Sequence, residues 1–131
     1  MKRWAWGATA ALAAATSVPA MAEWVSIGDQ GPAEVFIDKT TITRTGDMVK
    51  MWMLQELKTP GSAGGAAYVS LKRQDEFDCK DPRTRGVQIA AYPQSKGEGK
   101  AVASEKGSGS WSKIVPGSTN EVLWKIACAK E

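Results

Sequence analysis

The sequence of 131 residues contains no histidine. Its absence excludes the Ser-His and Cys-His pairs that activate most nucleophiles, and it removes the commonest ligand of hydrolytic zinc sites. The glycine-rich stretch at 61–65 has neither the spacing nor the Lys-Ser/Thr ending of a phosphate-binding loop. We therefore expect no catalytic site of these classes, no metal and no cofactor.

Long apolar runs are also scarce, and the one exception lies at the N-terminus. A basic start at residues 1–3 is followed by an Ala-rich stretch at 4–18 and by the small-x-small pattern at 20–22. This order predicts a secretory signal peptide over residues 1–22, cut after Ala22. The alternative is an uncleaved anchor, because residues 4–22 just reach the length of a bilayer span. The stretch is weakly hydrophobic, however, and it ends in a cleavage pattern.

No cysteine adjoins the expected cut, so no lipid can be attached there. We expect an exported chain, periplasmic, secreted or at the cell surface, that is not a lipoprotein and has no integral membrane span after cleavage. The 109 residues of 23–131 are enough for a single domain. They carry 15 basic and 14 acidic residues, a net charge of +1, once Lys2 and Arg3 have left with the leader. Nucleic-acid binding needs a stronger basic excess, so we expect no nucleic-acid partner.

Cysteine occurs only twice, at Cys79 and Cys128. In an exported chain a pair of cysteines favours one disulfide. The alternatives are reactive thiols, for which the spacing of 49 positions offers no CxxC motif, and a metal site, which lacks further ligands. A disulfide that closes a loop of this length stabilises a fold by roughly 4 kcal/mol in the chain-entropy model.

Alternation of apolar and polar residues predicts mostly strands after residue 23. The expected strands are 24–27, 34–38, 40–43, 48–57, 67–77, 83–92 and 100–104, with a hairpin turn at 45–47 and a loop at 58–65. Met51-Trp52-Met53-Leu54 places apolar side chains on both faces of its strand. We expect a helix to cover one face and a partner to cover the other.

The C-terminus changes to helical periodicity. Ser118 and Glu121 form a Ser-x-x-Glu capping box, and the apolar positions after it make one broad face: Val122, Leu123, Trp124, Ile126, Ala127 and Cys128. The helix would pack on the sheet, and Cys128 would join its end to the strand end at Cys79. The predicted fold is therefore α+β, an antiparallel sheet with one helix docked on a face.

An acidic cluster at Asp75, Glu76, Asp78 and Asp81 raises the possibility of a carboxylate pair for glycoside hydrolysis. Alternation, however, places Asp75 and Glu76 on opposite faces of their strand. The basic residues nearby are Lys72, Arg73, Lys80, Arg83 and Arg85. We interpret the charges as cross-strand ion pairs on a solvated face and expect no enzymatic activity.

Four tryptophans remain after the expected cleavage: Trp24, Trp52, Trp111 and Trp124. We expect Trp52 and Trp124 to lie in the core. Trp111 follows a Gly/Ser-rich stretch and is the one most suited to an exposed binding surface, because tryptophan is enriched at binding hot spots.

The chain resembles the surface-adhesin protein E family over essentially all of residues 23–131. The segments that carry the resemblance are 35–38, 42–46 and 49–52, Ser70-Leu71-Lys72, Glu76-Phe77-Asp78-Cys79, the pair Arg83 and Arg85, and Trp124-x-x-Ala127-Cys128. The resemblance implies about six antiparallel strands, a C-terminal helix tied to them by Cys79 and Cys128, and a homodimer. It also implies binding of host extracellular-matrix and plasma proteins.

Two functional hypotheses follow. The first is an exported, non-enzymatic protein-binding domain that acts through an exposed sheet face or through a basic stripe with Trp111: Lys72, Arg73, Arg83 and Arg85. The second is a soluble periplasmic inhibitor or envelope accessory protein that binds an enzyme or an envelope component. An adhesin has to stay on the cell, and the missing lipid-attachment cysteine is what keeps the second hypothesis open.

Overall fold

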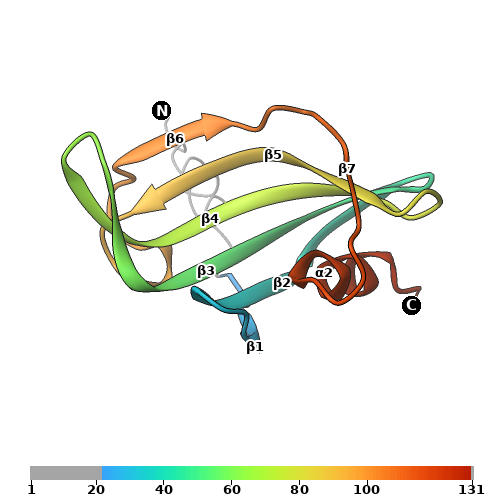
Figure 1. Cartoon of the computed structure of the whole chain (residues 1–131), viewed down its shortest axis with the longest axis horizontal. Coiled ribbons are helices and arrows are strands. Elements are labelled where there is room, and N and C mark those ends of the chain that lie inside the picture. The colour runs from blue at the N-terminus through green and yellow to red at the C-terminus, as the bar shows by residue number, and fades with distance from the viewer. Residues whose placement is uncertain (1–21, 131) are drawn as a thin grey trace, which may run out of the picture.

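Strands that follow one another in the chain also lie next to one another in space (Figure 1). The computed structural model describes residues 22–130. The sheet order is β1-β2-β3-β4-β5-β6, every pair is antiparallel, and the short β7 also pairs with β5. The elements are β1 (Val25–Asp29), β2 (Ala33–Thr45), β3 (Met48–Ala63), β4 (Ala66–Asp78), β5 (Arg83–Tyr92), the 3-10 turn η1 (Ser95–Gly97), β6 (Ala103–Lys106), β7 (Ser112–Lys113) and α2 (Thr119–Cys128). The predicted antiparallel sheet with one C-terminal helix is confirmed.

The strands β3 and β4 form a hairpin longer than the sequence predicts. The expected loop at 58–65 shrinks to a turn at Gly64 and Gly65, both with positive φ, which is the backbone that a two-residue hairpin turn requires. Pro60 does not end β3, because it falls in a register shift between Glu56 and Gly61 where no ladder N–H is needed. The expected break before residue 40 is likewise a register shift inside a continuous β2. The last predicted strand, 100–104, lies at 103–106 instead.

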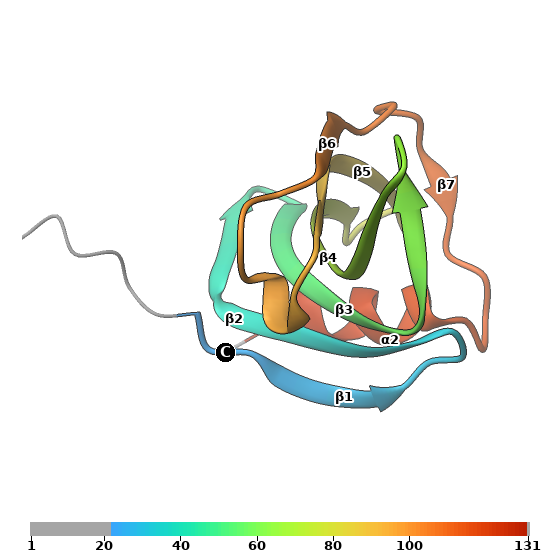
Figure 2. The ribbon, with the colours of Figure 1, turned by 90° about the vertical axis from the view of Figure 1, so that its left-hand side faces the viewer.

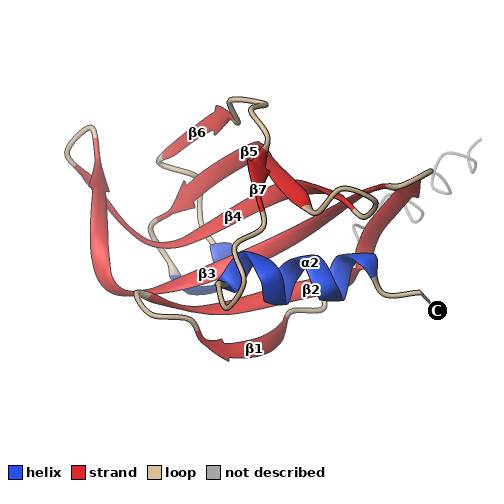
Figure 3. Ribbon diagram, turned by 45° about the vertical axis from the view of Figure 1, so that its right-hand side comes forward, coloured by secondary structure: helices blue, strands red, loops and turns tan. Residues whose placement is uncertain are grey.

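One face of the sheet carries the core and lies against α2 (Figure 3). The buried residues of this core are Val35, Ile37, Val49, Met51, Met53 and Phe77 from the strands, and Leu123 and Ala127 from the helix. Val122 is 38% exposed and lies outside the buried face, contrary to the prediction. The other five apolar positions make the predicted contact: Leu123 and Ala127 are buried, and Trp124, Ile126 and Cys128 are partly buried against the core.

Both ends of α2 are fixed by specific contacts. At the start, Ser118 Oγ accepts a hydrogen bond from the Glu121 amide, while the Glu121 carboxylate accepts one from Gly117 N at 3.0 Å. In the predicted capping box the Glu121 carboxylate would accept from the Ser118 amide. Here it accepts from the amide one residue earlier, that of Gly117. At the other end, Cys128 is bonded to Cys79, just beyond β4, with 5.6 Å between their Cα atoms. The predicted disulfide is confirmed, and both cysteines of the chain are used in it.

Within residues 22–130, no helix has the length and apolar character of a membrane span.

Candidate functional site

The face of the sheet turned away from α2, which we call the open face, carries a hollow. Seen end-on, the sheet is strongly curled, with β1 and β2 along the bottom and β6 at the top (Figure 2). Directly paired residues point to the same side, so the register defines a row across five strands: Asp38, Trp52, Gln74, Gln88 and Lys106. A pocket of about 840 Å³ lies over this row, and residues from both edges of the sheet line it. We call it the groove.

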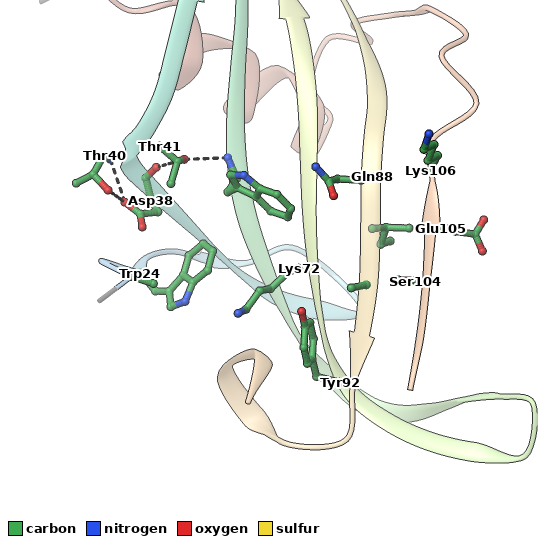
Figure 4. Close-up of a pocket in the computed structure, with 14 residues that line it drawn as sticks. Trp24, Asp38, Thr40, Thr41, Lys72, Gln88, Tyr92, Ser104, Glu105 and Lys106 are labelled. Carbon is green, nitrogen blue, oxygen red and sulfur yellow. Dashed lines mark hydrogen bonds between the residues drawn. The ribbon is translucent and has the colours of Figure 1, made fainter. Parts of the chain in front are cut away.

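Three aromatic side chains line the groove: Trp24, Trp52 and Tyr92. In Figure 4 Lys72 lies between Trp24 and Tyr92, and its Nζ is 5.0 Å from the centroid of the Tyr92 ring. Trp52 is partly exposed, so its predicted place in the core is wrong. The physical reason is alternation, because Met51 and Met53 face the helix and the residue between them must face the groove.

Trp124 behaves as expected and packs against the core. Its indole Nε1 also donates a hydrogen bond to the Asp78 carbonyl at 2.9 Å. This bond explains why a tryptophan is tolerated at a partly buried helix position, since the ring has an apolar body and one N–H that must be satisfied. It also links α2 to the end of β4 beside the disulfide.

One end of the open face is closed by the chain itself. Leu54 on β3 is completely buried and its neighbour Phe36 nearly so, and η1 contacts both β3 and β4. Lys96 Nζ stands 3.7 Å from the centroid of the Phe36 ring. The expectation that a partner covers the second face of β3 is therefore wrong at Leu54, where the segment after β5 provides the cover. Only the Trp52 part of that face stays open.

Residues 94–97, which we call the covering segment, are hydrogen-bonded to two polar side chains of the sheet. Ser70 Oγ donates to the Gln94 carbonyl at 2.6 Å and accepts from the Gly97 amide at 2.9 Å. Glu56 accepts hydrogen bonds from the Ser95 hydroxyl, at 2.7 Å, and from the Lys96 amide. The covering segment is therefore fixed over this end of the open face, next to the groove.

Asp38 lies at the edge of the groove near Trp24 and is only 3% exposed. Burial raises the pKa of Asp38, but hydrogen bonds from the Thr40 hydroxyl and from the amides of Glu23 and Thr40 outweigh that effect. The pKa therefore lies below its ordinary value, and the group is a carboxylate at neutral pH.

The other end of the open face carries the predicted residues Arg83, Arg85 and Trp111. Both guanidinium groups lie 4.3 Å from the centroid of the Trp111 ring. Arg83 Nε is 2.9 Å from Asp78 Oδ2, and Arg85 Nη2 is 2.7 Å from Glu76 Oε1. The cross-strand ion pairs are confirmed, but their carboxylates are buried rather than solvated. These arginines therefore serve to neutralise internal charges.

The predicted basic stripe is divided between the two faces of the sheet. Lys72 lies on the open face with Arg83 and Arg85, whereas Arg73 points to the opposite face and pairs with Asp75 at 3.1 Å. Asp75 and Glu76 point to opposite faces as alternation predicts. They therefore do not make the facing carboxylate pair that glycoside hydrolysis uses.

Among known proteins, one family model matches the chain, and several solved structures share its fold. The model of the surface-adhesin protein E family matches residues 24–129. A structure of Haemophilus influenzae protein E is similar with 15% identity and a TM-score of 0.65, covering 84% of this chain and 86% of that one. Its selenomethionine form gives 14% identity, a TM-score of 0.66 and coverage of 84% and 88%. No curated protein sequence is significantly similar to the chain.

Proposed function

The chain belongs to the surface-adhesin protein E family, and on that premise we propose that it is an exported, non-enzymatic domain that binds a protein through the groove of its open face. One observation carries this proposal. Two partly exposed tryptophans and a tyrosine line a hollow of about 840 Å³ that the described chain does not fill. Aromatic side chains in such a setting are the residues that dominate binding energy at protein interfaces.

Charge supports the groove rather than the arginine cluster as the centre of binding. Arg83 and Arg85 already hold buried carboxylates and stack on Trp111, so a partner would have to compete for them. Lys72, in contrast, takes part in none of the four ion pairs found within residues 22–130. We therefore assign Arg83, Arg85 and Trp111 to the rim of the surface and Lys72 to its centre.

The partner best suited to this surface presents apolar or aromatic side chains next to an acidic group, which Lys72 would meet. Host extracellular-matrix and plasma proteins are the class that family membership favours, and the test begins with them. Binding to immobilised proteins of this class should be saturable at physiological salt. Light scattering of the chain alone decides whether the groove is instead occupied by a second copy.

Variants of the groove test the assignment directly. Trp52→Ala and Lys72→Ala should each weaken binding, Trp52→Ala by about tenfold or more, as hot-spot truncations do. Lys125→Ala is the matched control, because Lys125 is exposed on α2, on the other side of the sheet. Circular dichroism would confirm that each variant is folded. Equal binding by all three variants would contradict the proposal.

A periplasmic inhibitor or envelope accessory protein is the second candidate. The observation that favours it is the sequence at the expected cut, where Glu23 and not a lipid-carrying cysteine follows Ala22. Cell fractionation distinguishes the two, because an adhesin must be accessible to protease on intact cells. A chain confined to the periplasm that recovers one stoichiometric partner would favour the second candidate.

A further inference from the structure

Four carboxylates are buried in the sheet, and one of them differs from the rest. Asp75, Glu76 and Asp78 each have an arginine partner, Arg73, Arg85 and Arg83 respectively. Asp38 takes part in none of the four ion pairs within residues 22–130, the fourth being Lys58–Asp29 at the surface. A buried charge without a counter-ion is costly, so the exception calls for a physical explanation.

The donors that reach Asp38 are all neutral in the uncut chain. Oδ1 accepts from the amide and the hydroxyl of Thr40, and Oδ2 accepts from the backbone nitrogen of Glu23 at 3.0 Å. Glu23 is also the residue that the pattern Ala20-Met21-Ala22 would leave at the N-terminus after signal cleavage. A sequence pattern and a buried contact thus identify the same nitrogen atom independently.

We propose that removal of residues 1–22 supplies the missing counter-ion, as the α-ammonium group of Glu23 paired with the Asp38 carboxylate. Hydrolysis of the Ala22–Glu23 peptide bond consumes one water. Ala22 leaves as a carboxylate, and the Glu23 nitrogen becomes an amine that takes up a proton. The nitrogen is already within hydrogen-bond distance, so the neutral N–H···O bond becomes a charge-assisted one without movement of the chain.

The ion pair between the Glu23 ammonium group and Asp38 would also fix one side of the groove. Ala22 and Trp24 both line the groove, on either side of Glu23. Cleavage removes Ala22 from that lining and anchors the residue directly before Trp24. The other charged groups along the groove are Lys72, Glu105 and Lys106, which the same test leaves unchanged. The inference does not depend on which partner the groove binds.

Insertion of one alanine between Ala22 and Glu23 tests the pair in the full, exported chain. Cleavage after Ala22 then leaves an extra residue ahead of Glu23 and moves the ammonium group away from Asp38. We expect the insertion to raise the unfolding equilibrium constant by about tenfold or more, because it separates a buried charge from its counter-ion. In an Asp38→Asn background the insertion should change the constant by less than about twofold, since coupled sites are non-additive.

Two controls make the outcome decisive. Asp29→Asn, at the exposed end of β1, should leave the full effect of the insertion intact. Acylation of the α-amino group, followed by mass spectrometry, should be about tenfold slower or more for the chain that begins at Glu23 than for the extended chain, and this readout needs no Asp38 variant. The proposal is overturned if the insertion has the same effect with and without Asp38, or if the two chains are acylated at equal rates. It is also overturned if the mature wild-type chain begins at a residue other than Glu23.

Discussion

Asp75 and Asp78 lie three residues apart on β4 and are almost equally buried, yet their pKa values move in opposite directions. Burial raises the pKa of Asp75, and the charge and hydrogen bonds of Arg73 offset this only in part. Hydrogen bonds from the Asp81 amide, the Arg83 guanidinium and the Lys80 amide lower the pKa of Asp78 despite burial. Desolvation is the largest effect on Asp75, whereas the hydrogen bond from the Asp81 amide is the largest effect on Asp78, so the two shifts have opposite signs.

Because the pKa values of Asp75 and Asp78 shift in opposite directions, the stabilities of Asp75→Asn and Asp78→Asn relative to wild type should depend on pH in opposite ways. Asp75 binds its proton more tightly in the folded state, so its contribution to stability falls as pH rises from its unfolded value of 3.8 through the raised pKa. The free energy of unfolding of Asp75→Asn, relative to wild type, should therefore rise with pH over that window. Urea denaturation between about pH 3 and pH 7 measures it.

For Asp78 the sign is reversed. Its contribution is present above the unfolded value of 3.8 and is lost as pH falls through the lowered pKa. Asp78→Asn should therefore be less stable than wild type at neutral pH, and the deficit should shrink in acid. A deficit that stays constant with pH would show that hydrogen-bond geometry, not charge, is what the variant removes.

Single residues were predictable from sequence where alternation alone decides their direction. Asp75 and Glu76 face opposite ways as expected, and the same rule, applied consistently, separates Lys72 from Arg73 and turns Trp52 away from the core. The burial of Asp38 was beyond such reasoning. It depends on contacts from Glu23 and Thr40 whose geometry no local pattern encodes.

Among the elements, the covering segment after β5 is held by Glu56 and by the hydroxyl group of Ser70, which makes two of its hydrogen bonds. Ser70→Ala would leave the Gln94 carbonyl and the Gly97 amide without their partner. We expect a loss of about 1–3 kcal/mol in the free energy of unfolding, the usual cost of unsatisfied buried polar groups. Hydrogen exchange should show faster exchange at Gly97. Ser104→Ala, on exposed β6, is the control and should be nearly neutral.

The helix depends on the disulfide more than on its own propensity. With ten residues α2 is too short to be stable alone in water, and it is held by Leu123, Ala127 and the bond to Cys79. Replacement of both cysteines by alanine should lower the free energy of unfolding by about 4 kcal/mol. Denaturation in urea with and without reductant checks this. An unchanged midpoint would mean that packing alone holds the helix.

Helix and strands were predictable as elements because their periodicities are strong, whereas the ends of β3 were not. A Pro-Gly pair usually ends a strand, and here a register shift accommodates it. For the segment directly after β5 the sequence patterns predict no structural role. Its place over Leu54 follows from long-range hydrogen bonds to Ser70 and Glu56, which no sequence period reveals.

At the scale of the whole molecule, one core joins α2 to three strands. The buried cluster runs from Val35 on β2 through Met51 and Phe77 to Leu123 and Ala127. Residues 23–131 should therefore unfold in a single transition with the disulfide intact. Far-UV circular dichroism reports on the secondary structure and tryptophan fluorescence on the packing around Trp24, Trp52, Trp111 and Trp124, and both should give the same midpoint. Separate midpoints would show that side-chain packing around the tryptophans is lost in a different step from the secondary structure.

The overhang of the β3–β4 hairpin has a consequence for how the molecule behaves at high concentration. The pairing of β2 with β3 ends at Leu57, so within the described chain the residues of β3 beyond it have no β2 partner. A free strand edge invites another copy to add its own strand and so begin aggregation. Pro60, which is exposed on this edge, lacks the N–H that such pairing requires. The residue that looks like a strand breaker thus works as a gatekeeper against self-association.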